Sequence, residues 1–435
     1  MTKLSNSKKL YEYAQNFVIR GVHTNFKYIY PHPIYFSKAE GSKIWDVDGN
    51  EYIDCVLNFG PLILGHRHPK VVQAVKDQLE TGLTVGLPTE RSVEVSKKLV
   101  DMIPSAETVR LGNTGTEAVM HALKIARAYT GKNKILKIEG GYNGHCDDVL
   151  VSHHPPLKLA GPETSPNAVP DSGGLRKGVT EDTIVIPFNN QEVAEKVIKE
   201  NKKEVAALII EPIQFNLGCV LPKEGYLQAI REMTERTNIV LIFDEVRSGF
   251  RPAPGGAQEY YGVDPDLTVI AKAIANGFPL SALLGKKDVM DVTDPVTGRV
   301  LYAGTYNANQ MSVAAASATL EQLRKGDIQK YLNKTCQKLV SRFREVAEDN
   351  KVQATMQALG GFFQIYFTEH APVDYRTALL ADRAKFLKLQ DVMINEGIYC
   401  WPDHLFPHGI SAAHDEENLQ KISKTIEMGM SKIVE

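Results

Sequence analysis

Asp244 and Lys272 each follow a short apolar run within residues 239–280. The two runs, Val240–Phe243 and Leu267–Ile270, have the length of a β-strand. An acid and an amine at the ends of buried strands are partly desolvated, which costs free energy unless a partner takes up the charge. The two buried charges therefore predict that a partner or a cofactor lies between the two side chains.

Pyridoxal phosphate (PLP) meets this requirement. Its aldehyde forms a Schiff base with a lysine, and its protonated ring nitrogen pairs with a carboxylate and makes the ring an electron sink. We expect Lys272 to be the Schiff-base lysine and Asp244 to be the partner of the ring nitrogen. On these two residues alone, a buried ion pair is the competing interpretation.

Three linked motifs carry a family resemblance. FDEVRSGFR begins at Phe243, GGAQEYYGVDPDLTVIAKAIANGFP begins at Gly255, and LGNTGTEA begins at Leu111. Together they resemble the class III aminotransferases, and most closely the glutamate-1-semialdehyde aminomutase branch, over about residues 35–414. The resemblance implies the α/β fold type I of PLP-dependent transferases: a large domain with a mostly parallel seven-stranded sheet flanked by helices, and a smaller α+β domain.

The order of the predicted elements supports an α/β fold independently of the resemblance. Helical and strand patterns alternate four or five times, which is typical of a parallel sheet that collects ligands at the carboxyl ends of its strands. We expect an amino-terminal segment with a helix over residues 1 to about 30 and a small hairpin turning at Asp48-Gly49-Asn50. The expected divisions are an amino-terminal segment 1–65, a PLP-binding domain 66–322 and a small domain 323–435.

A phosphate site is predicted at residues 114–116. A short strand there gives way to a Gly/Thr turn and a clear helix, so free N–H groups and the helix dipole point at one place. We expect Thr114, Gly115 and Thr116 to bind the phosphate, although an ordinary capped helix would have the same pattern. Neither a Walker loop nor a dinucleotide-binding GxGxxG motif is present.

The resemblance implies the other cofactor contacts. Tyr142 matches the aromatic residue that stacks on the ring, Val246 packs on the opposite face, and Asn216 lies near the phenolic oxygen. Asn143 departs from the family, which commonly has His there. Thr305 stands where the family takes a phosphate contact from the other subunit, which implies a homodimer with shared sites.

The substrate pocket departs from the aminomutase pattern at two positions. Lys27 stands where that branch carries an arginine for the substrate carboxylate, and Phe406 stands where it carries a glutamate. A lysine is a point charge and cannot form the two-pronged contact of an arginine. Further candidates for substrate contact are Phe59, Glu211 and His404.

The resemblance and these departures lead to a ranked hypothesis. We expect an intermolecular aminotransferase that moves an amino group from a small amino compound to a keto or aldehyde acceptor by a ping-pong mechanism. Glutamate-1-semialdehyde 2,1-aminomutase is the alternative. A PLP-dependent racemase or decarboxylase would use the same core, and a binding protein without catalysis is a hypothesis of another class.

The irregular segment 153–178 is rich in Pro, Gly and Ser, and the resemblance implies a loop that gates the active site. His153 and His154 are then expected to be solvated. His66 and His68 lack a third residue at metal-binding spacing, so we expect no metal.

Composition bounds the remaining possibilities. The 435 residues carry a formal net charge of only −2, which indicates neither a nucleic-acid partner nor a basic membrane patch. No apolar run has the length of a bilayer span, and the first residues lack the apolar region of a secretory signal. The five cysteines form no CxxC. We therefore expect a cytoplasmic protein with free thiols.

Overall fold

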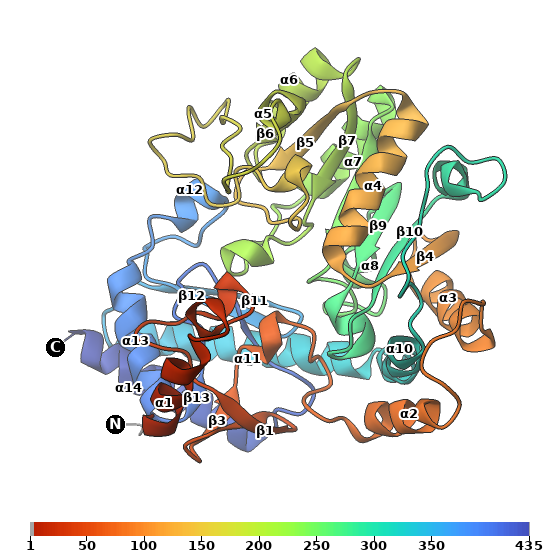
Figure 1. Ribbon diagram of the computed structural model, residues 1–435. Coiled ribbons are helices and arrows are strands. Elements are labelled where there is room, and N and C mark those ends of the chain that lie inside the picture. Colours follow the sequence, from red (N-terminus) through yellow and green to blue (C-terminus); the bar gives the residue numbers. More distant parts are fainter. Residues whose placement is uncertain (1–3, 435) are drawn as a thin grey trace.

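The computed structural model describes residues 4–434 and is built around one seven-stranded sheet (Figure 1). Its strands lie in the order β4-β10-β9-β8-β7-β5-β6, and all run parallel except β10, which is antiparallel to both neighbours. In chain order the strands are β4 (Thr108–Gly112), β5 (Lys134–Ile138), β6 (Thr183–Ile186), β7 (Val205–Ile210), β8 (Val240–Glu245), β9 (Leu267–Ile270) and β10 (Ser281–Gly285).

Helices bury both faces of this sheet. Because side chains alternate along a strand, Ala207 and Ile209 of β7 pack with helix α4 (Gly115–Thr130), while Leu208 and Ile210 pack on the other side. That second side is covered by α6 (Gln191–Asn201) and α7 (Tyr226–Thr237). Strands buried on both faces need continuous apolar runs, which explains sequences such as VAALII in β7.

Two smaller sheets lie beside the large one, at the lower left in Figure 1. The first joins the two ends of the chain, since β13 (Ile398–Tyr399) pairs in parallel with β3 (Glu51–Asp54). It is completed by β1 (Phe36–Glu40) and β2 (Lys43–Asp46), and β2 and β3 form the predicted hairpin. The second sheet contains β11 (Thr355–Leu359), β12 (Phe362–Tyr366) and β14 (His408–Gly409).

Long helices pack against these sheets and complete the carboxyl-terminal part. Their buried apolar side chains share one core with strands β4, β9 and β10 of the large sheet. They are α10 (Gln310–Leu323), α11 (Asp327–Asp349), α13 (Arg383–Asn395) and α14 (Glu416–Val434), with the earlier helices α2 (Pro69–Leu79) and α3 (Glu90–Met102) packed on α10. The remaining short helices are α5 (Val179–Asp182), α8 (Gly256–Tyr261), α9 (Lys287–Met290) and α12 (Tyr375–Ala378). The predicted division at residues 65 and 322 stays a prediction.

The predicted amino-terminal helix is shorter than expected. Helix α1 covers only Ser5–Ala14, and residues 1–3 of the prediction lie outside the described part of the chain. Beyond α1 the backbone turns sharply, because Arg20 and Gly21 both have positive φ values. No helix within residues 4–434 combines the length and apolar character needed to cross a membrane.

Candidate active site

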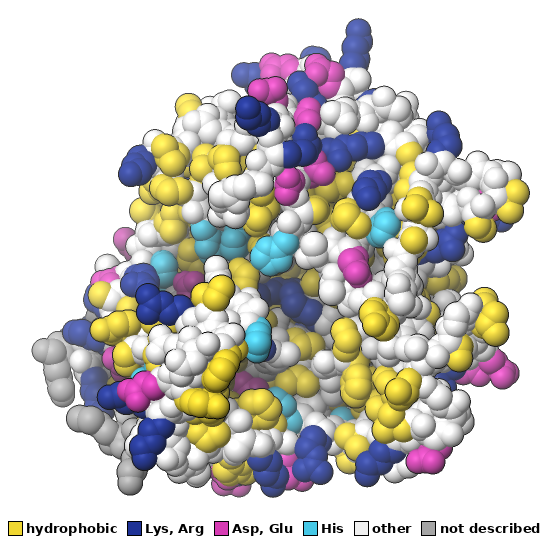
Figure 2. All heavy atoms as spheres, in the orientation of Figure 1, with side chains coloured by type: hydrophobic (Ala, Val, Ile, Leu, Met, Phe, Trp, Pro, Cys, Tyr) yellow, Lys and Arg dark blue, Asp and Glu magenta, His cyan; other side chains and the backbone are white. Residues whose placement is uncertain are grey.

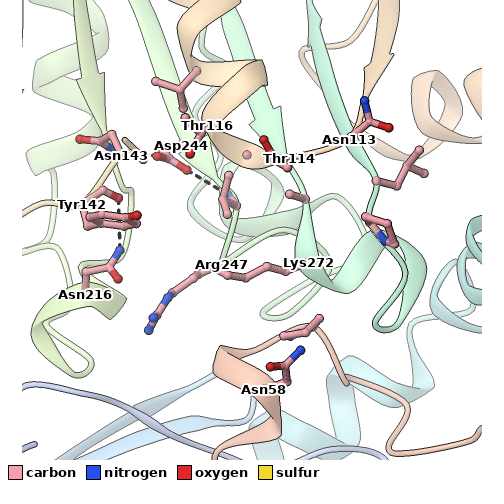
Figure 3. Close-up of a pocket in the computed structure, with 18 of the residues that line it drawn as sticks. Asn58, Asn113, Thr114, Thr116, Tyr142, Asn143, Asn216, Asp244, Arg247 and Lys272 are labelled. Carbon is pink, nitrogen blue, oxygen red and sulfur yellow. Dashed lines mark hydrogen bonds between the residues drawn. The ribbon is translucent and has the colours of Figure 1, made fainter. Parts of the chain in front are cut away.

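A cavity of about 400 Å³ opens at the carboxyl ends of the parallel strands (Figure 3). In the space-filling view, histidine side chains border a hollow in the middle of this face (Figure 2). The structure brings together nearly all of the predicted cofactor residues, which come from five different strand ends. Those that line the cavity are Thr114, Gly115, Thr116, Tyr142, Asn216, Asp244, Val246 and Lys272.

Lys272 enters the cavity from the turn after β9. Its backbone has a positive φ of 47°, a conformation that a lysine adopts only where the surrounding structure enforces it. Burial lowers the pKa of the Lys272 amine to about 7, and the nearby charge of Arg247 adds to this effect. Asp244 and Glu211 act in the opposite direction. A large share of the amine is therefore neutral, and nucleophilic, near neutral pH.

Asp244 lies near the end of β8 and is only 4% exposed. Asn143 Nδ2 donates a hydrogen bond to Asp244 Oδ2 over 2.8 Å, and the Val246 N–H donates to Oδ1 over 3.1 Å. Burial raises the pKa of the Asp244 carboxyl, while these two hydrogen bonds oppose the rise. The two contacts also fix which way the carboxyl group faces. The contribution of Asn143 was not predicted, because the sequence pattern only marked it as a departure from the family.

The predicted phosphate site offers fewer free donors than expected. Glu117 Oε2 accepts hydrogen bonds from the N–H groups of Asn113 and Thr114, and Thr114 Oγ1 accepts one from the Glu117 N–H. Thr114 thus caps α4 with its own N–H already engaged. The N–H groups of Gly115 and Thr116 begin the helix and have no preceding turn to bond with. These two groups, with the helix dipole, are the anion-binding donors at this edge of the cavity.

Gly115 is also required by close packing. A Cβ atom at this position would lie 2.9 Å from Val246 Cγ2, closer than real Cβ contacts come. The glycine therefore lets the helix start approach Val246 without a clash. Because Val246 is predicted to face the cofactor ring, this contact sets the distance between the anion-binding donors and the ring position.

Glu211 organises the opposite wall. Its Oε1 accepts a hydrogen bond from the Tyr142 N–H over 3.0 Å, and its Oε2 accepts one from Asn216 Nδ2 over 2.8 Å. Burial, together with the charge of Asp244, raises the pKa of Glu211 to about 7. Tyr142 is further held by a contact between its hydroxyl and His145 Nε2 at 2.8 Å. The loops after β5 and β7 are thus joined in one network beside Asp244.

His153 and His154 are partly buried and packed, which corrects the prediction that they are simply solvated. Their rings stack on each other with centroids 3.9 Å apart, and the His153 ring lies 5.0 Å from that of Tyr142. Burial lowers the pKa of both histidines. Their backbone N–H groups are tied to Asp171, which lies later in the same irregular segment. The segment therefore builds part of the wall behind Tyr142.

Of the predicted substrate residues, Glu211 lines the cavity of Lys272, whereas Lys27, Phe59, His404 and Phe406 do not. Lys27 and Phe59 line a neighbouring cavity of about 710 Å³, which shares Asn58 and Gly277 with the first one. The Phe406 ring lies edge-on to Phe59, with centroids 5.2 Å apart. His404 is buried, and its Nδ1 lies 3.5 Å from Asp403 Oδ1.

Thr305 does not line the cavity of its own chain and is exposed. This placement fits the predicted contact with a second subunit. Within the described residues no cluster of His, Cys, Asp and Glu is arranged to hold a metal ion. His66, one of the two histidines considered for that role, instead contacts Asp54 Oδ2 through Nε2 at 2.8 Å.

These residues fit PLP at each of its polar ends. The site offers a buried amine with a lowered pKa, an oriented carboxylate, and helix N–H groups for the phosphate, at the sheet edge where α/β folds bind ligands. Fold and site together define a PLP-dependent α/β enzyme.

Comparisons with known proteins identify the family. The family model described as "Aminotransferase class-III" matches residues 27–426. Glutamate-1-semialdehyde 2,1-aminomutase of Methanocaldococcus jannaschii is 41% identical over 425 residues, which cover 98% of each chain. The chain therefore belongs to the class III aminotransferases, as the motifs predicted.

Solved structures agree with this assignment. An omega-transaminase from Sphaerobacter thermophilus superposes with a TM-score of 0.94 at 33% identity, covering 99% of this chain and 98% of the other. A transaminase with PLP bound gives a TM-score of 0.89 at 30% identity, covering 100% and 99%. The predicted fold is confirmed, PLP is the cofactor, and the protein is an enzyme that acts on small amino and keto compounds.

Proposed function

We propose that Lys272 is the residue that binds the PLP aldehyde and that later carries the proton of the reacting carbon. When bound, PLP stabilises the electrons left behind when that carbon loses its proton. The base that takes this proton must lie beside the carbon and have a pKa near the working pH. Lys272 has a pKa of about 7. The single observation that carries this assignment is the shared cavity of Lys272, Asp244 and the start of α4.

The other residues divide the binding of the cofactor among them. Asp244, oriented by Asn143, faces the place of the ring nitrogen and keeps it protonated. Gly115 and Thr116 hold the phosphate with their N–H groups. Tyr142 and Val246 enclose the ring from its two faces, and Asn216 lies at the side where the phenolic oxygen belongs.

Of the two reactions considered, the aminomutase is better supported by the comparisons than the intermolecular aminotransferase that the sequence analysis preferred. The identity of 41% to a glutamate-1-semialdehyde 2,1-aminomutase extends over nearly the whole of both chains. We therefore place intramolecular amino transfer, which would give 5-aminolevulinate, first.

The intermolecular aminotransferase is retained as the second candidate because of a specific observation. Lys27 lies outside the cavity that contains Lys272, and Phe406 places an aromatic ring where the family carries a glutamate. The similar structures named as transaminases support the same candidate.

One experiment separates the two candidates. The PLP-loaded enzyme is incubated with glutamate-1-semialdehyde without any acceptor, and 5-aminolevulinate is measured. Rapid formation supports the aminomutase. Absence of this product, together with amine transfer from a panel of amino donors to 2-oxoglutarate or pyruvate, supports the intermolecular aminotransferase.

We also propose that the enzyme is a cytoplasmic homodimer with shared sites. Large apolar side chains are exposed on two segments, at Leu83, Val85 and Leu87 and again at Leu301 and Tyr306. Apolar side chains gathered in this way are typical of interfaces. Thr305 lies in the second segment, so a subunit docked there would receive it at its own phosphate site.

A further inference from the structure

Arg247 is a buried cation that the described chain leaves incompletely paired. Its side chain lines the cavity of Lys272 and is only 9% exposed. Nη1 donates to the Phe215 carbonyl oxygen over 3.1 Å, and Nε is buried without any acceptor. Within residues 4–434, Arg247 has no carboxylate at ion-pair distance. A buried charge in this state is costly unless an anion joins it.

The neighbouring acids do not fill this role. Glu211 raises the pKa of Arg247 more than any other acid does. Both of its carboxylate oxygens, however, already accept hydrogen bonds from Tyr142 and Asn216. Arg251, four residues on, provides the contrast. Arg251 is fully buried and its Nε also lacks an acceptor, but both of its Nη atoms donate to carbonyl oxygens, those of Gly360 and Gly60, and it does not line the cavity. Arg251 is thus a structural cation, whereas Arg247 retains donors for a ligand.

Aromatic rings shape the surroundings of Arg247. Its guanidinium lies 4.8 Å from the centroid of the Phe406 ring, and Phe406 packs edge-on against Phe59. Phe59 in turn packs against Trp401 with centroids 5.1 Å apart. In Figure 3 the Arg247 guanidinium points to the lower left of the view, away from Lys272. The guanidinium therefore stands beside an apolar wall that excludes water and strengthens any ion pair formed there.

We propose that Arg247 binds the carboxylate of the amino substrate, in the role that the sequence analysis considered for position 27. The inference rests on the proposed function, because it needs a substrate whose amine reaches the cofactor at Lys272. A planar guanidinium can hold a carboxylate by two parallel hydrogen bonds, which the ammonium group of Lys27 cannot do. The substrate class is then an amino compound that carries a carboxylate.

The test uses two amines that differ only in the carboxylate: 5-aminolevulinate, and 1-aminobutan-2-one, which lacks it. Dissociation constants for the PLP-loaded enzyme are measured from the change in its visible absorbance on titration. We expect the native enzyme to bind 5-aminolevulinate about 100-fold more tightly than 1-aminobutan-2-one, because only 5-aminolevulinate can form the buried bidentate ion pair. Equal affinity for the two amines in the native enzyme would overturn the proposal without any variant.

Variants locate the preference. Arg247→Met is expected to abolish the preference by weakening the binding of 5-aminolevulinate alone. Arg247→Lys keeps the buried charge but not the forked donor group, and it is expected to reduce the preference about 10-fold. Lys27→Met is expected to leave it intact. Loss of the preference in Lys27→Met, with retention in Arg247→Met, would contradict the proposal. A merely structural Arg247 would weaken both amines equally in both Arg247 variants, which would also contradict it.

Failure of the underlying function gives a different result. If the native protein forms no borohydride-stable PLP adduct at Lys272, the proposed function is wrong. If it forms the adduct but shows no carboxylate preference, only the assignment of Arg247 is wrong.

Discussion

Asn143 Nδ2 donates a hydrogen bond to Asp244 Oδ2 over 2.8 Å, joining the loop after β5 to the end of β8. The bond is buried, and it fixes the carboxyl group that faces the cofactor cavity. Through this contact Asn143, which departs from the family pattern, supports Asp244, which matches that pattern.

Replacing Asn143 by Leu is expected to weaken PLP binding. The change removes one hydrogen bond to a buried carboxylate, worth about 1.5–3 kcal/mol, so the dissociation constant of PLP should rise roughly 10- to 100-fold. Equilibrium dialysis measures this constant. Asn133→Leu is the matched control, because Asn133 Nδ2 also donates to a carboxylate, that of Asp182, but at the surface. Equal PLP affinity in the two variants would show that the Asn143 contact has no such role.

Gly115→Ala is expected to disturb the cofactor site through Val246. The added Cβ would lie 2.9 Å from Val246 Cγ2, so the helix start or the valine must move. Overpacking of this kind costs about 1–3 kcal/mol, and we expect PLP affinity to fall about 10-fold or more. The double variant Gly115→Ala/Val246→Ala removes the clash and should recover part of the affinity. No recovery would mean that position 115 acts in another way.

The pKa of Lys272 predicts how the rate of PLP attachment depends on pH. Only the neutral amine attacks the aldehyde, and the pKa of about 7 means that the amine is mostly charged below this pH and mostly neutral above it. The rate should therefore rise with pH and level off above about pH 8, whereas an ordinary lysine with a pKa of about 10.4 would show no plateau there. Stopped-flow absorbance of the PLP-free protein measures the rate.

Arg247→Met provides an independent check on the same titration. The positive charge of Arg247 lowers the Lys272 pKa, so its removal should move the rise to higher pH. A midpoint that stays in place or moves down would contradict the assigned influence of Arg247 on Lys272.

Shared sites predict that two inactive variants restore activity when mixed. Lys272→Ala lacks the amine in its own site, and Thr305→Glu should repel the phosphate in the site of its partner. A mixed dimer contains one intact site, so exchange of subunits should return roughly a quarter of the native activity. Mixing Lys272→Ala with the double variant Lys272→Ala/Thr305→Glu is the control and should return none. A mixture of the two single variants that stays inactive after subunit exchange would argue against shared sites.

The backbone positions of the site could be predicted because they follow from buried strands. Asp244, Glu211 and Lys272 each follow an apolar run, and parallel strands bring such ends to one edge. Thr114 was also predicted, but not that Glu117 would occupy its N–H, since a capping contact depends on side-chain rotamers.

Contacts between loops could not be predicted in the same way. The bond from Asn143 to Asp244 spans 101 residues and has no periodic signal. Arg247 lies within the motif FDEVRSGFR. That its Nε has no acceptor becomes visible only when the surrounding carbonyl and carboxylate groups are placed. His153 and His154 were expected in solvent because their segment is irregular, and the packing against Tyr142 overrides that pattern.

The central claim is that the amine of Lys272 holds the cofactor across the cavity from Asp244. The most direct test is to load the protein with PLP, reduce it with borohydride, digest it and locate the modified lysine by mass spectrometry. We predict one pyridoxyl-modified peptide, containing Lys272, and none from a Lys272→Ala variant treated in the same way. Modification at another lysine would contradict the account. Loss of PLP from the native protein because borohydride did not fix it to a lysine would contradict the account as well.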